Sequence, residues 1–103
     1  MKLLRQAILK SLPALYETEG VDIDNKKIIT KFFCPWNHWT WYGIEFDGED
    51  VFFGYVVGDY NELGYFNLSE LSGAKGPFGL NIERDLYFSP KRLSEIKKLS
   101  TEG

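Results

Sequence analysis

Cys34 and His38 are the residues whose types and spacing come closest to a nucleophilic catalytic pair. A thiol beside a histidine base can attack a carbonyl, and these are the single cysteine and the single histidine of the chain. A spacing of four unites two side chains on a helix, but Pro35 disfavours a helix here. A cysteine at the end of a strand is usually a small, buried apolar residue. We therefore expect Cys34 to be structural, and we predict no catalytic residue and no enzymatic activity.

Carboxylates gather around a predicted turn at Asp47-Gly48, where Glu49 and Asp50 follow directly. Oxygen-rich turns can bind Mg²⁺ or Ca²⁺. The twelve-residue calcium-loop pattern is absent, however, and Asp-Gly is a common hairpin turn because glycine accepts a positive φ. We expect a solvated turn with no metal and no cofactor. A divalent-metal-binding or enzymatic protein that uses the acidic turn 47–50 remains an alternative.

Arg84 stands between Glu83 and Asp85 in an otherwise apolar stretch. An arginine in this position more often makes a structural ion pair than a binding site. We expect it to pair with a carboxylate on a neighbouring loop.

Aromatic side chains are the strongest binding signal, because 13 of the 17 lie between Phe32 and Phe66. Alternation along a strand would place Trp39, Trp41 and Glu45 on one face, and Tyr42, Ile44 and Phe46 on the other. Both faces are then largely apolar, whereas a half-exposed strand usually alternates apolar with polar residues. Either loops or a dimer partner bury the second face, or it is a partly exposed aromatic platform. The residues predicted to contact a partner are Trp36, Trp39, Trp41, Tyr55, Glu45, Asp47, Glu49 and Asp50.

Charge is partitioned along the chain in the same way as the aromatic residues. Residues 32–70 hold seven acidic residues and no Lys or Arg, whereas residues 1–31 and 71–103 each carry a net charge of +2. Phosphates would be repelled by such a sheet, so direct nucleic-acid binding is disfavoured. A basic or DNA-processing protein partner suits an acidic aromatic surface better. An acidic nucleic-acid mimic that inhibits a DNA-binding host protein is a second alternative.

Periodicity predicts the elements that position these residues. Apolar residues recur at helical spacing from Leu3 to Leu15, and Pro13 should end or kink that helix near Leu12. After a polar loop over 18–27, four strands are predicted, at residues 28–34, 39–46, 51–58 and 63–68. Their short connections require an antiparallel meander.

The C-terminal third is predicted to hold two further helices. Asn67 opens a stretch with the spacing of a capping box, so a short helix should start there and end by Gly73. Residues 85–88 are predicted to form a last strand, and Ser89 and Pro90 to begin a terminal helix. The sequence thus predicts one α+β domain over residues 1–103. Its four- to five-stranded antiparallel meander sheet should carry the N- and C-terminal helices packed on it.

Composition limits where the protein can act. A length of 103 residues with 44% hydrophobic content suffices for one packed core. No apolar run is long enough to span a membrane, and Arg5 and Lys10 interrupt any signal-peptide core. A lone cysteine excludes an intrachain disulfide. We expect a cytoplasmic protein without membrane association, and a homodimer is possible.

Six blocks of the sequence carry a family resemblance. In chain order they are Pro13-Ala14-Leu15-Tyr16, Trp39-Thr40-Trp41-Tyr42, Glu45-Phe46-Asp47-Gly48-Glu49-Asp50, Phe52-Phe53-Gly54, Glu62-Leu63-Gly64-Tyr65-Phe66 with Ser69-Glu70-Leu71, and Ile82-Glu83-Arg84-Asp85-Leu86. Together they resemble one bacterial family, the domain-of-unknown-function family numbered 2958. Members of that family are small proteins or modules tied to plasmids, phages and integrated elements, with no activity that could be carried over. The resemblance implies an accessory role in a mobile element. Cys34 and the polar residues 24–27 depart from the family's pattern.

These observations predict a non-enzymatic accessory protein of a bacterial mobile element. We expect it to bind a protein partner through an acidic aromatic sheet surface. No cofactor is expected.

Overall fold

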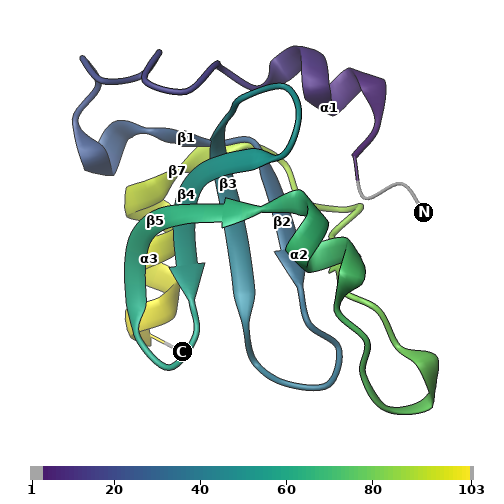
Figure 1. Ribbon diagram of the computed structural model, residues 1–103. Coiled ribbons are helices and arrows are strands. Elements are labelled where there is room, and N and C mark those ends of the chain that lie inside the picture. Colours follow the sequence, from purple (N-terminus) through teal and green to yellow (C-terminus); the bar gives the residue numbers. More distant parts are fainter. Residues whose placement is uncertain (1–3, 103) are drawn as a thin grey trace.

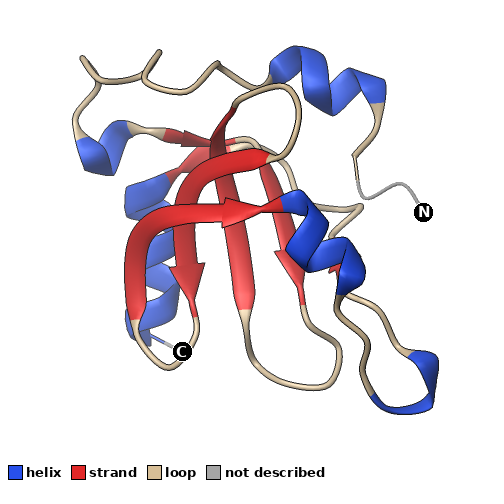
Figure 2. Ribbon diagram, in the orientation of Figure 1, coloured by secondary structure: helices blue, strands red, loops and turns tan. Residues whose placement is uncertain are grey.

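The computed structural model describes residues 4–102 and consists of an antiparallel sheet with helices on both faces (Figures 1 and 2). The sheet has five strands in the order β5-β4-β3-β2-β6. Their bounds are Thr30–Phe33 for β2, Thr40–Phe46 for β3, Val51–Val57 for β4, Asn61–Asn67 for β5 and Glu83–Arg84 for β6. The predicted α+β class and antiparallel meander are confirmed. Strand β6 joins the edge of β2 after the chain has left the meander.

A second, two-stranded ladder joins the two ends of the chain. The predicted strand over 28–34 is divided at Ile29 into β1 (Lys27–Ile28) and β2, and β1 pairs with β7 (Lys91–Arg92). Residues 85–88 form a turn, so the prediction of a last strand there was wrong. The strand that pairs with the outer edge of β2 is instead β6, the two residues just before this turn. They lie opposite Phe32 and Phe33.

Three α-helices and two short 3₁₀ helices complete the chain. Helix α1 (Gln6–Ser11) ends as predicted before Pro13, with Leu12 in an extended conformation. The 3₁₀ helices are η1 (Ile23–Asn25) and η2 (Pro77–Gly79). Helix α2 is Leu68–Gly73, and α3 is Leu93–Glu102. None of the helices within residues 4–102 has the length and apolar character that crossing a bilayer requires.

The two C-terminal helices begin with caps that the sequence analysis did not predict. Asn67 precedes α2 but does not cap it, because Asp50 accepts the hydrogen bonds from its first turn. Helix α3 begins at Leu93 rather than near Ser89, since Lys91 and Arg92 are held in the ladder with β1. The Glu95 carboxylate accepts a hydrogen bond from the backbone N–H of Arg92 at 2.9 Å and satisfies one free donor at this helix start.

Two apolar cores lie on the opposite faces of the sheet. The first surrounds the fully buried ring of Phe52, which lies 4.4 Å from that of Phe46 and 5.1 Å from that of Phe66 between ring centroids. Side chains of α1 and α2 pack against this core. The second core lies under α3, whose Leu93 and Ile96 pack with Ile28, Ile44 and Tyr55. Helices from both ends of the chain therefore pack on the sheet, as predicted, but on opposite faces.

A β-bulge at Ile44 decides which β3 residues face which core. The register with β4 runs from Gly43 opposite Gly54 directly to Glu45 opposite Phe53, which leaves Ile44 as an extra residue. Strict alternation beyond Gly43 was therefore a wrong prediction. Phe46 joins the core that contains Trp41, and Glu45 lies with Phe53 and Tyr65 on the opposite face.

Candidate functional site

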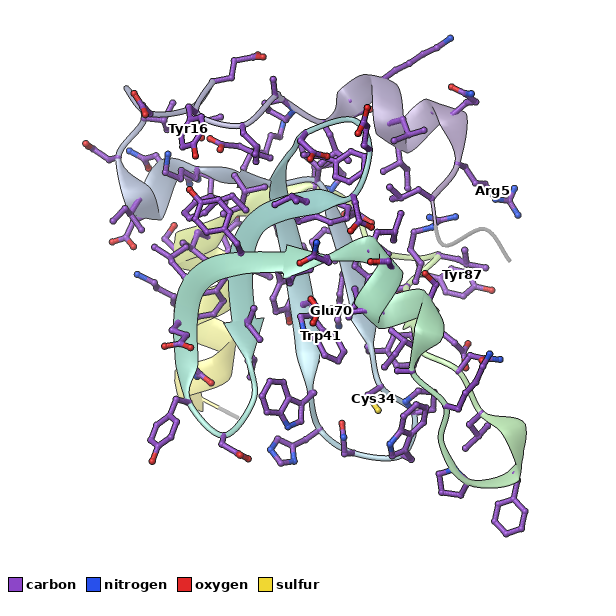
Figure 3. All side chains as sticks on the ribbon, in the orientation of Figure 1. Arg5, Tyr16, Cys34, Trp41, Glu70 and Tyr87 are labelled. Carbon is purple, nitrogen blue, oxygen red and sulfur yellow. The ribbon has the colours of Figure 1, made fainter. Side chains whose placement is uncertain are left out.

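Three tryptophans lie at the end of the sheet where the β2–β3 loop turns. The ring centroids of Trp39 and Trp41 are 6.0 Å apart, and these two rings and that of Trp36 are half-buried against the first core. Figure 3 shows Trp41 and Cys34 toward this end of the molecule, away from Tyr16. The predicted grouping of these three tryptophans agrees with their positions in the structure.

Two glycines allow the indole rings to lie directly on the backbone of neighbouring loops. A Cβ atom placed on Gly58, in the β4–β5 turn, would come within 2.6 Å of the Trp39 ring. A Cβ atom on Gly76, in the loop after α2, would collide with the ring of Trp36 in the same way. The tryptophans therefore hold three separate loops together at one end of the sheet (Figure 1).

Two aromatic side chains at this end are exposed. Tyr60 follows Gly58 in the β4–β5 turn, and Phe78 occupies the tip of the loop that contains Gly76. The Phe78 side chain is fully exposed. We call the set Trp36, Trp39, Trp41, Tyr60 and Phe78 the aromatic end.

The loop that carries Phe78 is internally braced. The backbone N–H of Gly76 donates to the carbonyl of Leu80 at 2.8 Å, and Lys75 Nζ donates to Asn81 Oδ1 at 2.8 Å. Phe78 has a φ of 58°, in the left-handed region that costs a non-glycine residue about 1 kcal/mol. A fixed loop thus presents an exposed phenylalanine in an unfavourable backbone conformation, and such conformations concentrate at functional positions.

The strands and turns beside the tryptophans are acidic, and the loop that carries Phe78 also holds one cation, Lys75. Asp59 and Glu62 flank Tyr60 on exposed positions, and Glu70 is exposed on α2. The sequence holds no Lys or Arg between Phe32 and Glu70. An apolar centre with acidic neighbours fits a partner surface whose rim is basic.

Comparison with protein families adds one finding. The family model described as "Protein of unknown function (DUF2958)" matches residues 3–102. The chain belongs to the DUF2958 family. No curated protein and no solved structure matches it. The residues of the aromatic end lie within the matched region, and the family description attaches no activity to any of them.

Two of the predicted contact residues of this DUF2958 protein are buried away from the aromatic end. Tyr55 is 6% exposed and packs in the second core, with its ring centroid 6.3 Å from that of Tyr42. Its predicted place beside the tryptophans was wrong, because Tyr55 pairs with Tyr42, and alternation along β3 places Tyr42 on the face opposite to Trp41. Glu45 is 4% exposed and cannot set the charge of a surface.

Glu45 instead anchors residues 16–18, in the segment before β1, to the sheet by hydrogen bonds. Its carboxylate accepts hydrogen bonds from the backbone N–H of Tyr16 at 2.8 Å and of Thr18 at 3.1 Å, and from the Thr18 hydroxyl. Lys26 Nζ donates to the same hydroxyl at 2.9 Å. Burial by itself would raise the pKa of Glu45. The hydrogen bonds from Thr18 and Tyr16, aided by the charge of Lys26, outweigh burial and lower this pKa below its usual range.

The carboxylates of the acidic turn hold the local backbone. Asp47 Oδ1 accepts the backbone N–H groups of Asp50, Glu49 and Val51 at 2.8–3.0 Å, which lowers the pKa of Asp47. Asp50 accepts from the Asn67 side chain and from Ser69, and these bonds lower its pKa as well. Asp47 and Glu49 are exposed, and Asp50 is half-buried. Among the side chains that the structure describes, in residues 4–98, no three of His, Cys, Asp or Glu are grouped so that they could hold a metal ion.

The structure also places the other residues that the sequence analysis considered, which are Cys34, His38 and Arg84. Cys34 is buried in the first core, as expected, whereas His38 is exposed in the β2–β3 loop. Asp85 pairs with Lys31 at 3.6 Å, and no carboxylate of the described residues pairs with Arg84. The ion pair predicted for Arg84 is therefore absent from the described part of this DUF2958 protein.

The sequence analysis did not identify Phe78 as a candidate contact residue. A signal was available in the sequence Gly76-Pro77-Phe78-Gly79, because a large apolar residue between turn-forming residues has no core to enter.

Proposed function

We propose that this protein is a non-enzymatic accessory protein of a bacterial mobile element that binds a protein partner through the aromatic end. The exposed Phe78, held on a braced loop at a positive φ, carries this proposal. Exposed aromatic anchors backed by well-packed neighbours are typical of the residues that dominate binding energy in protein interfaces. The half-buried rings of Trp36 and Trp39 supply such neighbours through their packing on Gly76 and Gly58.

Charge supports a basic partner. Asp59, Glu62 and Glu70 would face a positively charged rim, which accelerates association and selects among partners. A DNA-processing protein has such a surface, and the mobile-element role implied by the family resemblance makes proteins of this class the first to examine. Single-stranded nucleic acid is less well suited, because its backbone needs a cationic track along the aromatic residues.

A nucleic-acid mimic would need an array of free surface carboxylates that imitates phosphate spacing. Among the predicted acidic contact residues, Glu45 is buried, and Asp47 and Asp50 accept hydrogen bonds from the backbone. Partner binding through the aromatic residues is therefore the preferred function.

The test is a tagged pull-down from host lysate with and without nuclease, read by mass spectrometry. We compare the wild type with Phe78→Ala and with Tyr87→Ala, which removes an equally exposed ring outside the aromatic end. A protein captured by the wild type and by Tyr87→Ala, resistant to nuclease and lost with Phe78→Ala, would support the proposal. Equal capture by all three proteins would refute the role of Phe78. Capture that nuclease abolishes would favour nucleic-acid binding through the basic segments.

A further inference from the structure

A second candidate site lies at the opposite end of the sheet from the tryptophans. A pocket of about 260 Å³ lies between the segment before β1 and strands β3, β4 and β5. It is lined by Tyr16, Glu19, Lys26, Glu45, Phe53 and Tyr65. Figure 3 shows Tyr16 on the segment that runs from α1 toward η1. This pocket shares no residue with the aromatic end.

Aromatic rings form the walls of the pocket. The ring centroids of Phe53 and Tyr65 are 5.3 Å apart, and their planes meet at 58°, so the two rings form a corner rather than a flat stack. Tyr16 completes the wall from the facing segment. Tyr16 and Tyr65 are 60% and 56% exposed, which leaves their ring surfaces accessible from solvent.

The backbone of Tyr16 is held in an unfavourable conformation. Tyr16 has a φ of 69°, a conformation that L residues rarely adopt. The hydrogen bond from its N–H to the Glu45 carboxylate fixes this arrangement. A strained residue that is anchored to a buried charge and presents an open aromatic ring is typical of a preorganised ligand wall.

The charged groups of the pocket leave an excess of negative charge. Glu19 and Glu45 contribute two carboxylates, and Lys26 contributes one ammonium group. Lys26 directs its ammonium at Thr18, where it donates to the hydroxyl and to the backbone carbonyl. In the part of the chain that the structure describes, neither carboxylate forms an ion pair with Lys26. The charge of Lys26 acts on Glu45 through the shared Thr18 hydroxyl, so a cation entering the pocket would meet a net charge of −1 that Glu19 leaves.

We propose that this pocket binds an organic ammonium cation. The faces of Tyr16, Tyr65 and Phe53 would contact its methyl or methylene groups through cation–π attraction, and the exposed carboxylate of Glu19 would supply the counter-charge. Anionic ligands are disfavoured by the net negative charge of the pocket. The ammonium group can belong to a free small molecule or to a lysine side chain of a protein, because both present the same chemistry.

The test uses choline and its neutral carbon isostere, 3,3-dimethylbutan-1-ol, in an NMR titration of the ¹⁵N-labelled protein. Choline should shift the amide signals of residues 16–19 and 65 in a saturable manner, and the isostere should bind at least about fivefold more weakly. Tyr65→Leu should weaken choline binding about fivefold. Tyr60→Leu is the matched control, since it removes an exposed tyrosine outside the pocket.

Each other result decides against the proposal. Equal affinity for choline and the isostere would make the pocket an apolar site, and an absence of shifts at residues 16–19 and 65 would remove the site altogether. Equal effects of Tyr65→Leu and Tyr60→Leu would exclude the aromatic corner.

A peptide with one trimethyl-lysine, compared with the same peptide carrying norleucine, separates the two sources of the ammonium group. Tighter binding of the peptide than of choline assigns the site to a protein side chain, and the reverse assigns it to a free cation. Failure of this test leaves partner binding at the aromatic end unaffected.

Discussion

The carboxylate of Glu45 accepts a hydrogen bond from the backbone N–H of Tyr16 at 2.8 Å, across 29 residues of sequence. Glu45 lies just after the β-bulge in the centre of the sheet, and Tyr16 lies in a segment with little regular structure of its own. The bond is one of three from this segment to the same carboxylate. One buried side chain therefore sets the position of the residues that form one wall of the proposed cation pocket.

Glu45→Gln is expected to destabilise the protein by about 2 kcal/mol, because a charged acceptor of hydrogen bonds is replaced by a neutral amide with only one acceptor oxygen. Urea unfolding at neutral pH measures the loss. Glu49→Gln changes an exposed carboxylate of the neighbouring turn and should leave the free energy of unfolding unchanged. Equal stability of the wild type and Glu45→Gln would contradict a stabilising role for the buried carboxylate.

Lowering the pH should remove the contribution of Glu45 to the stability of the fold. The pKa of Glu45 is lower in the folded protein than in the unfolded chain, so the unfolded chain takes up the proton first as the pH falls. Its contribution is complete at neutral pH and is lost as the pH falls from the ordinary glutamate range through the lowered folded value. Between neutral pH and about pH 3, the wild type should lose more stability than Glu45→Gln. Parallel losses in the two proteins would show that Glu45 does not titrate as described.

Asp50→Ala should lower the midpoint of thermal unfolding by several degrees, because α2 loses its N-terminal cap. The Asp50 carboxylate accepts the backbone N–H of Ser69 at 2.8 Å and also its hydroxyl at 2.9 Å. Asn67→Ala tests the residue that the sequence pattern favoured as the cap. A larger effect of Asn67→Ala than of Asp50→Ala would contradict the assignment.

Phe78→Gly should raise the free energy of unfolding by up to about 1 kcal/mol, since glycine adopts a positive φ without steric cost and the side chain buries no surface. Chemical denaturation measures the gain. The same variant should lose the partner identified by pull-down. If Phe78→Gly is more stable than the wild type but no longer binds the partner, the Phe78 side chain serves binding and not the fold. A destabilised Phe78→Gly would instead show that the ring supports the fold.

Gly76→Ala should destabilise the protein by about 1–3 kcal/mol and alter tryptophan fluorescence, because the added methyl group collides with the Trp36 ring. Gly73→Ala is a matched control nearby at the end of α2, where an added Cβ meets nothing within 4 Å. If both variants behave alike, Trp36 does not depend on close contact with the backbone of Gly76.

Much of the fold follows from local sequence properties. The hairpin between β3 and β4 was predictable from the residues around Asp47-Gly48, since turn chemistry and strand propensity act between near neighbours. The end of α1 before Pro13 follows in the same way from the covalent geometry of proline. The grouping of Trp36, Trp39 and Trp41 was also accessible, because these residues are close in the sequence.

Only the tertiary structure decided which residues face which core and which remain exposed. The bulge at Ile44 shifts the register by one residue, buries Glu45 and turns Phe46 to the opposite face, and periodicity cannot detect such an insertion. The cap of α2 by Asp50 and the anchoring of Tyr16 by Glu45 join residues 19 and 29 positions apart. These contacts, and the pocket beside Tyr16, depend on how distant segments pack against one another, because burial and hydrogen bonding are properties of the assembled chain.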